Sequence, residues 1–173
     1  MILEDNRFCL RPVEPEDADF MWSVESDSLQ WIQNLLVAPF SRENLRNYAL
    51  NYEADPYEAG QLRLIMIEKH NGRRVGIIDL YDLIASQRTA WVGIYILPEF
   101  RGKDIGKTGL HLLEDYAIRI LNLRRLGAKI IENNESSMNL FLNSGFEWIG
   151  RLPGWIQSGK ELYSIHILQK SLS

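Results

Sequence analysis

The stretch Arg101-Gly102-Lys103-Asp104-Ile105-Gly106 decides most of what this sequence predicts about fold and function. An apolar run from Trp91 to Pro98 precedes it and a helical pattern follows it, so the order is strand, basic glycine turn, helix. Such a turn directs backbone N–H groups and the positive end of a helix dipole at one point, which suits a phosphate. It is neither a Walker loop nor a dinucleotide fingerprint. A sharp turn with solvated basic residues is the alternative that the stretch itself leaves open.

Composition and charge predict a single domain over residues 1–173, with 46% hydrophobic residues and a formal charge of −4. A net acidic chain is not expected to bind nucleic acid, although it tolerates cationic substrates. The sequence has neither an apolar run long enough for a membrane span nor a signal-peptide pattern, so we expect a cytoplasmic protein. Cys9 is the only cysteine and the three histidines are scattered, so we predict no disulfide and no metal site.

The predicted elements follow the order strand, two helices, three antiparallel strands, helix, strand, helix, two strands. Strands are expected at residues 7–11, 62–68, 74–83, 88–97, 126–131, 146–150 and 162–168, and helices at 14–25, 41–52, from the turn to 123, and at 135–144. Asn71-Gly72 is a strong hairpin signal between the second and third strands. Residues 27–40 and 53–60 are expected as loops, the first of them as a loop or broken helix. The order predicts an α/β protein with a mixed, mostly antiparallel sheet flanked by helices.

Three motifs, in order and with matching spacing, resemble the GNAT superfamily of acyl-CoA-dependent N-acetyltransferases over nearly the whole chain. Residues 94–106 are similar to the acetyl-CoA motif Gln/Arg-x-x-Gly-x-Gly/Ala. Residues 134–146 are similar to Asn-x-x-Ala/Ser followed by Leu-Tyr-x-x-x-Gly-Phe, and Leu10-Arg11-Pro12 with Asp17-Ala18 resembles the family's start.

Within the superfamily, the chain most resembles the ribosomal-protein N-terminal acetyltransferases and the spermidine acetyltransferases. Residues 76–80 and 121–123 are similar to the spermidine branch, and Gly159-Lys160-Glu161 fits the closing hairpin of both branches.

The resemblance implies acetyl-CoA as co-substrate. The strand edge at Ile96 and Leu97 would pair with the amide-bearing pantetheine arm by strand addition. Asn134 would contact the cofactor arm while also capping a helix. The turn would hold the pyrophosphate through its backbone N–H groups, and its implied cofactor contacts are Arg101, Gly102, Lys103, Asp104, Ile105, Gly106 and Lys107.

Two implied cofactor residues depart from the family pattern. Asp104 replaces a loop glycine; aspartate tolerates a positive φ and is a favoured N-cap, but its carboxylate would lie near the phosphates. Phe141 stands where the family usually has the tyrosine thought to protonate the departing thiolate, so packing in the core is its alternative role. Tyr163, Ser137 or water would then have to supply that proton.

An alkyl amine has a pKa near ~10, so acetyl transfer to it requires a base or a water chain. Asp79 matches a position where the spermidine branch has glutamate. Asp82 lies three residues further along the same strand, so the two side chains should point to opposite faces. The alternative is that both carboxylates are solvated or paired with arginine or lysine.

These residues predict an N-acetyltransferase that moves an acetyl group from acetyl-CoA directly to a primary amine, either a protein N-terminus or a small amine. A polyamine acceptor is the alternative within the family, favoured by acidic residues of the acceptor region: Asp27, Glu43, Glu53, Asp55 and Glu58. A non-catalytic acyl-CoA-binding module is the alternative of another class, favoured by Phe141 and Asp104. Cys9 is expected in the core rather than as a covalent relay, and a homo-oligomer is possible.

Overall fold

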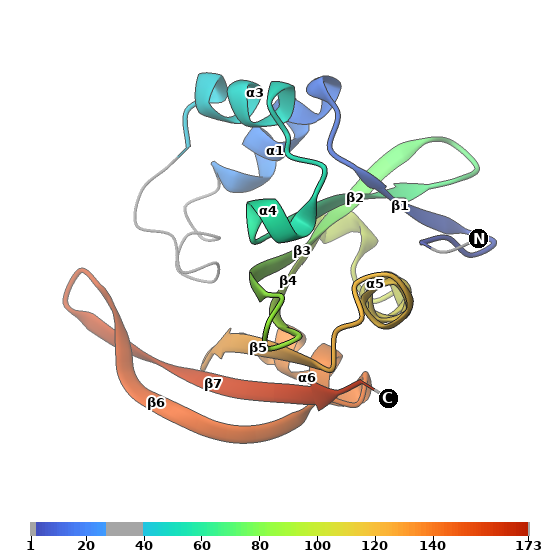
Figure 1. The fold of residues 1–173 in the computed structure, drawn as a ribbon. Coiled ribbons are helices and arrows are strands. Elements are labelled where there is room, and N and C mark those ends of the chain that lie inside the picture. Colours follow the sequence, from blue (N-terminus) through green and yellow to red (C-terminus); the bar gives the residue numbers. More distant parts are fainter. Residues whose placement is uncertain (1–2, 27–39, 173) are drawn as a thin grey trace.

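The computed structural model describes residues 3–26 and 40–172, and its strands form one seven-stranded sheet of order β1-β2-β3-β4-β5-β7-β6 (Figure 1). The strands are β1 (Phe8–Pro12), β2 (Leu62–Glu68), β3 (Arg73–Ile84), β4 (Thr89–Ile96), β5 (Arg125–Ile131), β6 (Glu147–Ser158) and β7 (Glu161–Ser171). The α-helices are α1 (Ala18–Glu25), α3 (Arg42–Leu50), α4 (Pro56–Ala59), α5 (Ile105–Arg119) and α6 (Glu135–Asn143). Short 3-10 turns lie at Pro15–Asp17 and Pro98–Phe100.

One strand pair in the sheet is parallel, and it is short. The β4 and β5 strands pair through Thr89↔Arg125, Ala90↔Leu126 and Trp91↔Gly127, while the other five neighbouring pairs are antiparallel. Beyond Trp91, β4 runs on to Ile96 without a further pair to β5 among the described residues. The two strands therefore separate in the middle of the sheet, and this separation positions the site described below.

Helices cover both faces of the sheet (Figure 1). Successive strand residues point to opposite faces. Leu64 and Ile78 accordingly belong to the buried cluster that includes α5, whereas Ile65 and Ile77 pack in a second cluster with α1 and α3. The larger cluster also contains Phe141 of α6.

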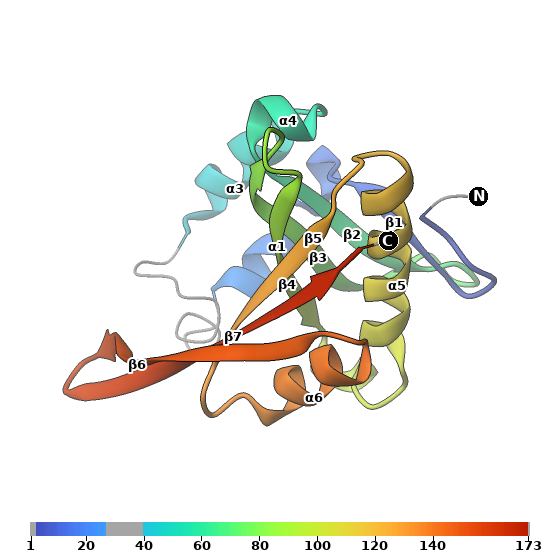
Figure 2. The same ribbon diagram turned by 60° about the horizontal axis from the view of Figure 1, so that its bottom comes forward.

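The β6–β7 hairpin projects beyond the body of the molecule (Figure 2). Its outer part carries Trp155 and Leu162, which are 66% and 61% exposed. Both strands are longer than the sequence predicts, because pairing continues past the register shift between Leu152 and Ile156 up to Ser158↔Glu161. The turn at Gly159 has a φ of 61°, a conformation that favours glycine.

The predicted fold class is confirmed, and two further predictions of local structure are wrong. Residues 53–60 contain α4 instead of a continuous loop, because Asp55 caps the Tyr57 N–H at 2.8 Å and Pro56 opens the turn. The α5 helix ends at Arg119 rather than near Leu123, since Asn122 has a φ of 50° and reverses the chain.

Residues 27–39, where a loop or broken helix is expected, lie outside the described residues. Within the described ranges, no helix is both long and apolar enough to cross a membrane.

Candidate active site

A cleft of about 1270 Å³ opens where β4 and β5 separate. Its walls include Ile94 and Ile96 on one side of β4, and Gly93 and Tyr95 on the other. Because neighbouring side chains of a strand point to opposite faces, a cleft lined by both sets passes through the sheet. One half lies toward α5 and α6, and the other half lies toward α1 and α3.

The basic turn forms the end of the first half. Gly102 and Asp104 have φ values of 72° and 58°, so both adopt the left-handed conformation that bends the chain into α5. A Cβ on Gly106 would lie 3.0 Å from Leu140, so this glycine allows the first turn of α5 to approach α6 closely. Asp104 occupies the N-cap position of α5, but among the described residues its side chain makes no capping hydrogen bond. The positive φ and the N-cap position are therefore as the sequence predicts, but the side-chain bond that makes aspartate a favoured cap is not formed.

Most of the predicted cofactor residues line this cleft. Arg101 does so, and its Nε donates to the Ile96 carbonyl at 2.9 Å while its guanidinium lies over Tyr95. The other predicted contacts on the cleft wall are Ile96, Gly102, Asp104, Ile105, Gly106, Lys107, Asn134 and Phe141.

Two predicted cofactor residues are not among the described residues that line the cleft. Lys103 turns its ammonium to the Glu99 carbonyl at 3.0 Å, and Leu97 donates its N–H to the Val75 carbonyl at 2.9 Å. Direct cofactor contact by these two residues stays a prediction.

The α6 helix contributes Asn134 and Phe141. Asn134 Oδ1 accepts from the Ser137 N–H at 3.1 Å, which confirms the predicted cap and leaves the amide nitrogen available to donate. Phe141 is 2% exposed and meets Phe146 edge to face, with ring centroids 4.9 Å apart. It therefore has the core-packing role that the sequence offers as its alternative, and it still lines the cleft.

The second half of the cleft contains a cluster of three charged residues, Glu25, Arg63 and Asp79. Arg63 donates to both carboxylate oxygens of Asp79, at 2.9 and 2.8 Å, and its Nη1 lies 2.9 Å from Glu25 Oε1. Burial by itself lowers the pKa of Arg63, but the Coulombic attraction of Asp79 and Glu25 more than offsets it, so that pKa is raised. Two carboxylates therefore lie beside one guanidinium in this half of the cleft.

Two tyrosines hold Arg63 in place. The Tyr52 hydroxyl accepts from the backbone N–H of Arg63 at 2.9 Å and donates to the backbone carbonyl of Arg63 at 2.8 Å. The Arg63 guanidinium lies 5.8 Å from the ring centroid of Tyr48, which lines the cleft. Burial raises the pKa of Tyr48, so its phenol stays protonated at neutral pH.

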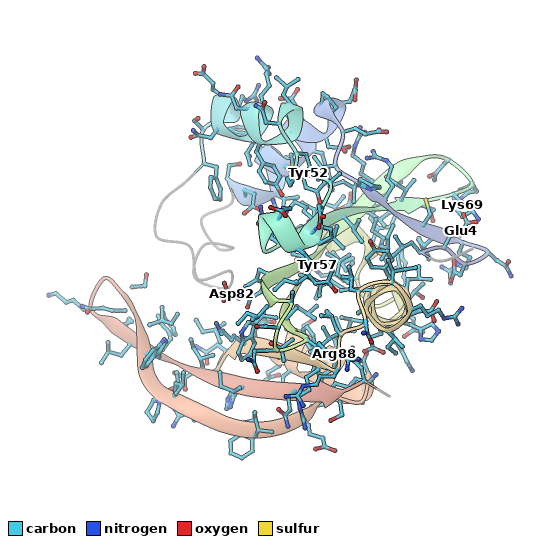
Figure 3. The ribbon with its side chains drawn as sticks, in the orientation of Figure 1. Glu4, Tyr52, Tyr57, Lys69, Asp82 and Arg88 are labelled. Atoms are coloured by element: carbon cyan, nitrogen blue, oxygen red, sulfur yellow. The ribbon has the colours of Figure 1, made fainter. Side chains whose placement is uncertain are left out.

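Asp79, Asp82 and Tyr163 were the acid–base candidates. Asp79 lines the cleft in bidentate contact with Arg63. Asp82 lies at the far end of β3 (Figure 3), with a φ of 47° and an oxygen 3.9 Å from Lys129 Nζ. Tyr163 pairs with Ile156 in the hairpin and is not among the described residues that line the cleft. Both aspartates thus have a basic partner, Arg63 for Asp79 and Lys129 for Asp82, which is the alternative that the sequence leaves open.

The cleft also contains residues that sequence reasoning missed. Of the five acidic residues expected near the acceptor, Asp27 lies outside the described residues and none of the other four lines the cleft. The residues found there instead are Glu25, Tyr48, Arg63, Tyr81 and Lys129. Alternation along β2 and β3 offers a partial signal for Arg63, since a charged residue within an apolar strand suggests a polar partner. Across the described residues, no group of three His, Cys, Asp or Glu side chains could hold a metal ion.

A strand pair that separates beside a basic glycine turn, with a cleft through the sheet, is the arrangement that the resemblance to acyl-CoA-dependent N-acetyltransferases implies. Residues 7–147 match the family described as the acetyltransferase (GNAT) domain. The chain belongs to this family, and it is an acetyl-CoA-dependent N-acetyltransferase of the GNAT type.

Several known proteins are similar to the chain. Spermidine N(1)-acetyltransferase of Escherichia coli K12 is 24% identical over 83% of this chain and 74% of that protein. A putative phosphinothricin acetyltransferase of Bacillus subtilis, YwnH, is 35% identical over 64% of this chain and 69% of that protein. The solved spermidine N-acetyltransferase of Vibrio cholerae, in complex with CoA and spermine, matches with a TM-score of 0.87 at 18% identity, over 97% of both chains. This structural likeness supports the fold.

Proposed function

We propose that this protein transfers the acetyl group of acetyl-CoA to a primary amine of a polyamine. The observation that carries the proposal is the presence of two carboxylates, Glu25 and Asp79, beside Arg63 in the half of the cleft toward α1 and α3. Lys129 also lines the cleft, but Asp82 lies 3.9 Å from its ammonium. A polycationic acceptor suits such a surface better than a neutral one. Similarity to spermidine acetyltransferases also favours a polyamine over a protein N-terminus.

The donor would occupy the other half of the cleft. The pyrophosphate of acetyl-CoA would lie against the turn from Arg101 to Gly106, where backbone N–H groups begin α5. The pantetheine arm would then run along the β4 edge toward Trp91, where the separation of the strands begins. Asn134 would donate to this arm from α6, since its Oδ1 is already used by the helix cap.

The reaction is a direct attack of the neutral amine nitrogen on the thioester carbonyl carbon, followed by loss of the CoA thiolate. The ammonium must first lose a proton, and Asp79 remains the proposed base because each of its oxygens has a further lone pair beside the Arg63 contact. CoA thiolate is a fair leaving group with a thiol pKa near ~8.5, so it can leave without a strongly acidic donor. Tyr81 lines the cleft and burial raises its pKa to about 12, so it stays protonated at neutral pH.

A thiol-release assay with acetyl-CoA tests this proposal. We expect turnover with spermidine and spermine and much weaker turnover with peptides that carry a free N-terminus. Mass spectrometry of the product identifies the acetylated nitrogen. Faster turnover with peptides would replace the polyamine by a protein acceptor. CoA binding without release for any amine would favour the non-catalytic module instead.

The homo-oligomer expected from the sequence stays a prediction. It is supported by the exposed apolar side chains of the projecting hairpin, Trp155 and Leu162. Exposed apolar surface of this kind often marks a contact with another chain.

A further inference from the structure

Gly93 lies at the vertex where β4 and β5 separate. It is two residues beyond Trp91, the last β4 residue paired to β5, and it pairs with Asp79 on β3. On β2, Arg63 pairs in turn with Asp79. Arg63, Asp79 and Gly93 therefore form one row across the sheet, with their positions facing α1 and α3.

The missing side chain of Gly93 leaves a gap in this row. A Cβ at Gly93 would meet Asp79 Cβ and Tyr81 Cε1 at 3.8 Å and Asp79 Oδ2 at 4.0 Å, all ordinary van der Waals distances. The backbone of Gly93 does not have the positive φ that would require glycine. Neither close packing nor backbone conformation thus explains a glycine here, although glycine in a strand interior costs about 0.5–1 kcal/mol relative to alanine.

Charged groups border the gap. Asp79 is held by Arg63 on one side. Lys129 lies two residues beyond Gly127, the last β5 residue paired to β4, and its ammonium is 4.4 Å from the Trp91 ring centroid. Arg63, Asp79 and Lys129 line the same cleft as the basic turn. Trp91 and Gly127 are not among the described residues that line it. The gap therefore connects the acceptor half of the cleft with the end of the β4 edge.

We propose that Gly93 is a specificity-determining residue, whose absent side chain forms the opening through which the acceptor amine reaches the thioester. This inference rests on the proposed function, which places the pantetheine arm along β4 and its reactive end near Trp91. An unbranched primary alkyl amine fits an opening the width of a missing side chain, with its nitrogen beside the Asp79 carboxylate. A branched or secondary amine would need the space that the sheet backbone and Tyr81 occupy.

The test is a graded series, Gly93→Ala, Gly93→Ser and Gly93→Val, with Gly150→Ala as the matched control. Gly150 lies on β6, a Cβ there would meet nothing within 4 Å, and it does not line the cleft. Steady-state kinetics with spermidine, calorimetric binding of CoA, and the melting temperature are measured for each variant. Calorimetric binding of spermidine to the CoA complex is measured as well.

We expect kcat/KM for spermidine to fall by about 10- to 100-fold in Gly93→Ala, because a small displacement of the reacting atoms has effects of this size. The loss should grow with side-chain size, while CoA affinity stays at the wild-type value and the melting temperature of Gly93→Ala stays the same or rises slightly, because alanine is favoured over glycine in a strand. Gly150→Ala should match wild type in spermidine kinetics and in the binding of CoA and spermidine.

Three results would overturn the inference. A wild-type kcat/KM in Gly93→Ala would show that the gap is not used. Weakened CoA binding with unchanged spermidine binding would assign the gap to the cofactor. A lower melting temperature in Gly93→Ala would mean that packing requires the glycine. If the wild-type protein shows no turnover with any amine, the proposed function is refuted instead. In that case, a difference in spermidine binding between wild type and Gly93→Ala would still show that the amine enters at Gly93.

Discussion

Replacing Asp104 should tighten CoA binding. This residue lines the cleft within the basic turn, with φ and ψ of 58° and 10°, and its carboxylate makes no capping bond among the described residues. The carboxylate therefore adds negative charge where a pyrophosphate is proposed to bind, without a compensating contact to the helix. We compare Asp104→Gly, which removes charge and side chain, with Asp104→Asn, which removes the charge and retains a side chain that tolerates a positive φ.

The expected magnitudes follow from charge and conformation. Two unit charges about 4 Å apart interact by about 1 kcal/mol in water and more near a protein surface. Removing the repulsion should thus tighten CoA binding at least about fivefold, since about 1.4 kcal/mol corresponds to a factor of ten. In Asp104→Gly, the folded state no longer holds a side-chain-bearing residue in the left-handed conformation, which stabilises it by about 1–2 kcal/mol at most. The larger backbone entropy that glycine loses on folding opposes this gain by about 0.5–1 kcal/mol. The melting temperature should therefore change little or rise slightly.

Calorimetric titration with CoA at low and high ionic strength measures this effect. Both variants should bind more tightly than wild type, and the advantage should shrink with added salt because the charges are exposed to solvent. Weaker binding by both variants would refute the reasoning and show that the carboxylate helps to hold the turn. A gain in Asp104→Gly alone would assign the effect to backbone geometry.

Three further predictions test the remaining site assignments. Arg101→Ala should weaken CoA binding more than Lys103→Ala in the same titration, because Arg101 lines the cleft and can bind phosphate bidentately; equal losses would mean that the turn is a solvated basic corner. Phe141→Tyr should raise kcat with little change in KM for acetyl-CoA if the site lacks its usual acid, and Tyr163→Phe should reduce kcat only if the hairpin tyrosine already supplies that proton. Asp79→Asn should slow turnover most near neutral pH and progressively less toward pH ~10, where the amine loses its own proton; a loss that is equal at all pH values would leave Asp79 the role of holding Arg63.

The parts of the fold that the sequence predicts well depend on local chemistry. Asn71 and Gly72 lie in the turn of residues 69–72 that joins β2 to β3, and Gly72 has a φ of 69°, a conformation that favours glycine. Ser41 and Asn134 each accept from a backbone N–H in the first turn of their helices, at 3.0 and 3.1 Å. These signals act within three or four residues, so the chain reveals them without knowledge of its tertiary contacts.

The acceptor half of the cleft depends on contacts between distant segments, and the sequence predicts it poorly. Glu25 reaches the site from α1, and it meets Arg63 across 38 positions of the chain, 63 minus 25. Apart from Asp27, which lies outside the described residues, the acidic residues expected near the acceptor are exposed on α3, on α4 or in the segment between them. Composition of a region therefore indicated its charge but not which side chains face the substrate.

A single extra residue in β3 explains why the Arg63–Asp79 pair could not be found by counting from the hairpin. Next to the turn, Ile67 pairs with Arg74, and continuing that register would place Arg63 opposite Ile78, with Asp79 on the other face of the sheet. The register instead shifts between Met66 and Ile67, so that Val75 is the unpaired residue.

The bulge at Val75 has a structural anchor at the cofactor end of the site. Its carbonyl accepts from the Leu97 N–H at 2.9 Å, at the point where β4 leads into the basic turn. The next residue, Gly76, has no space for a side chain, since a Cβ there would lie 2.4 Å from the Tyr95 carbonyl oxygen. The close approach of β3 to β4 thus fixes both the end of the cofactor strand and the register that turns Asp79 toward Arg63. The same irregularity therefore links the two halves of the cleft, although only the cofactor half has a local motif in the sequence.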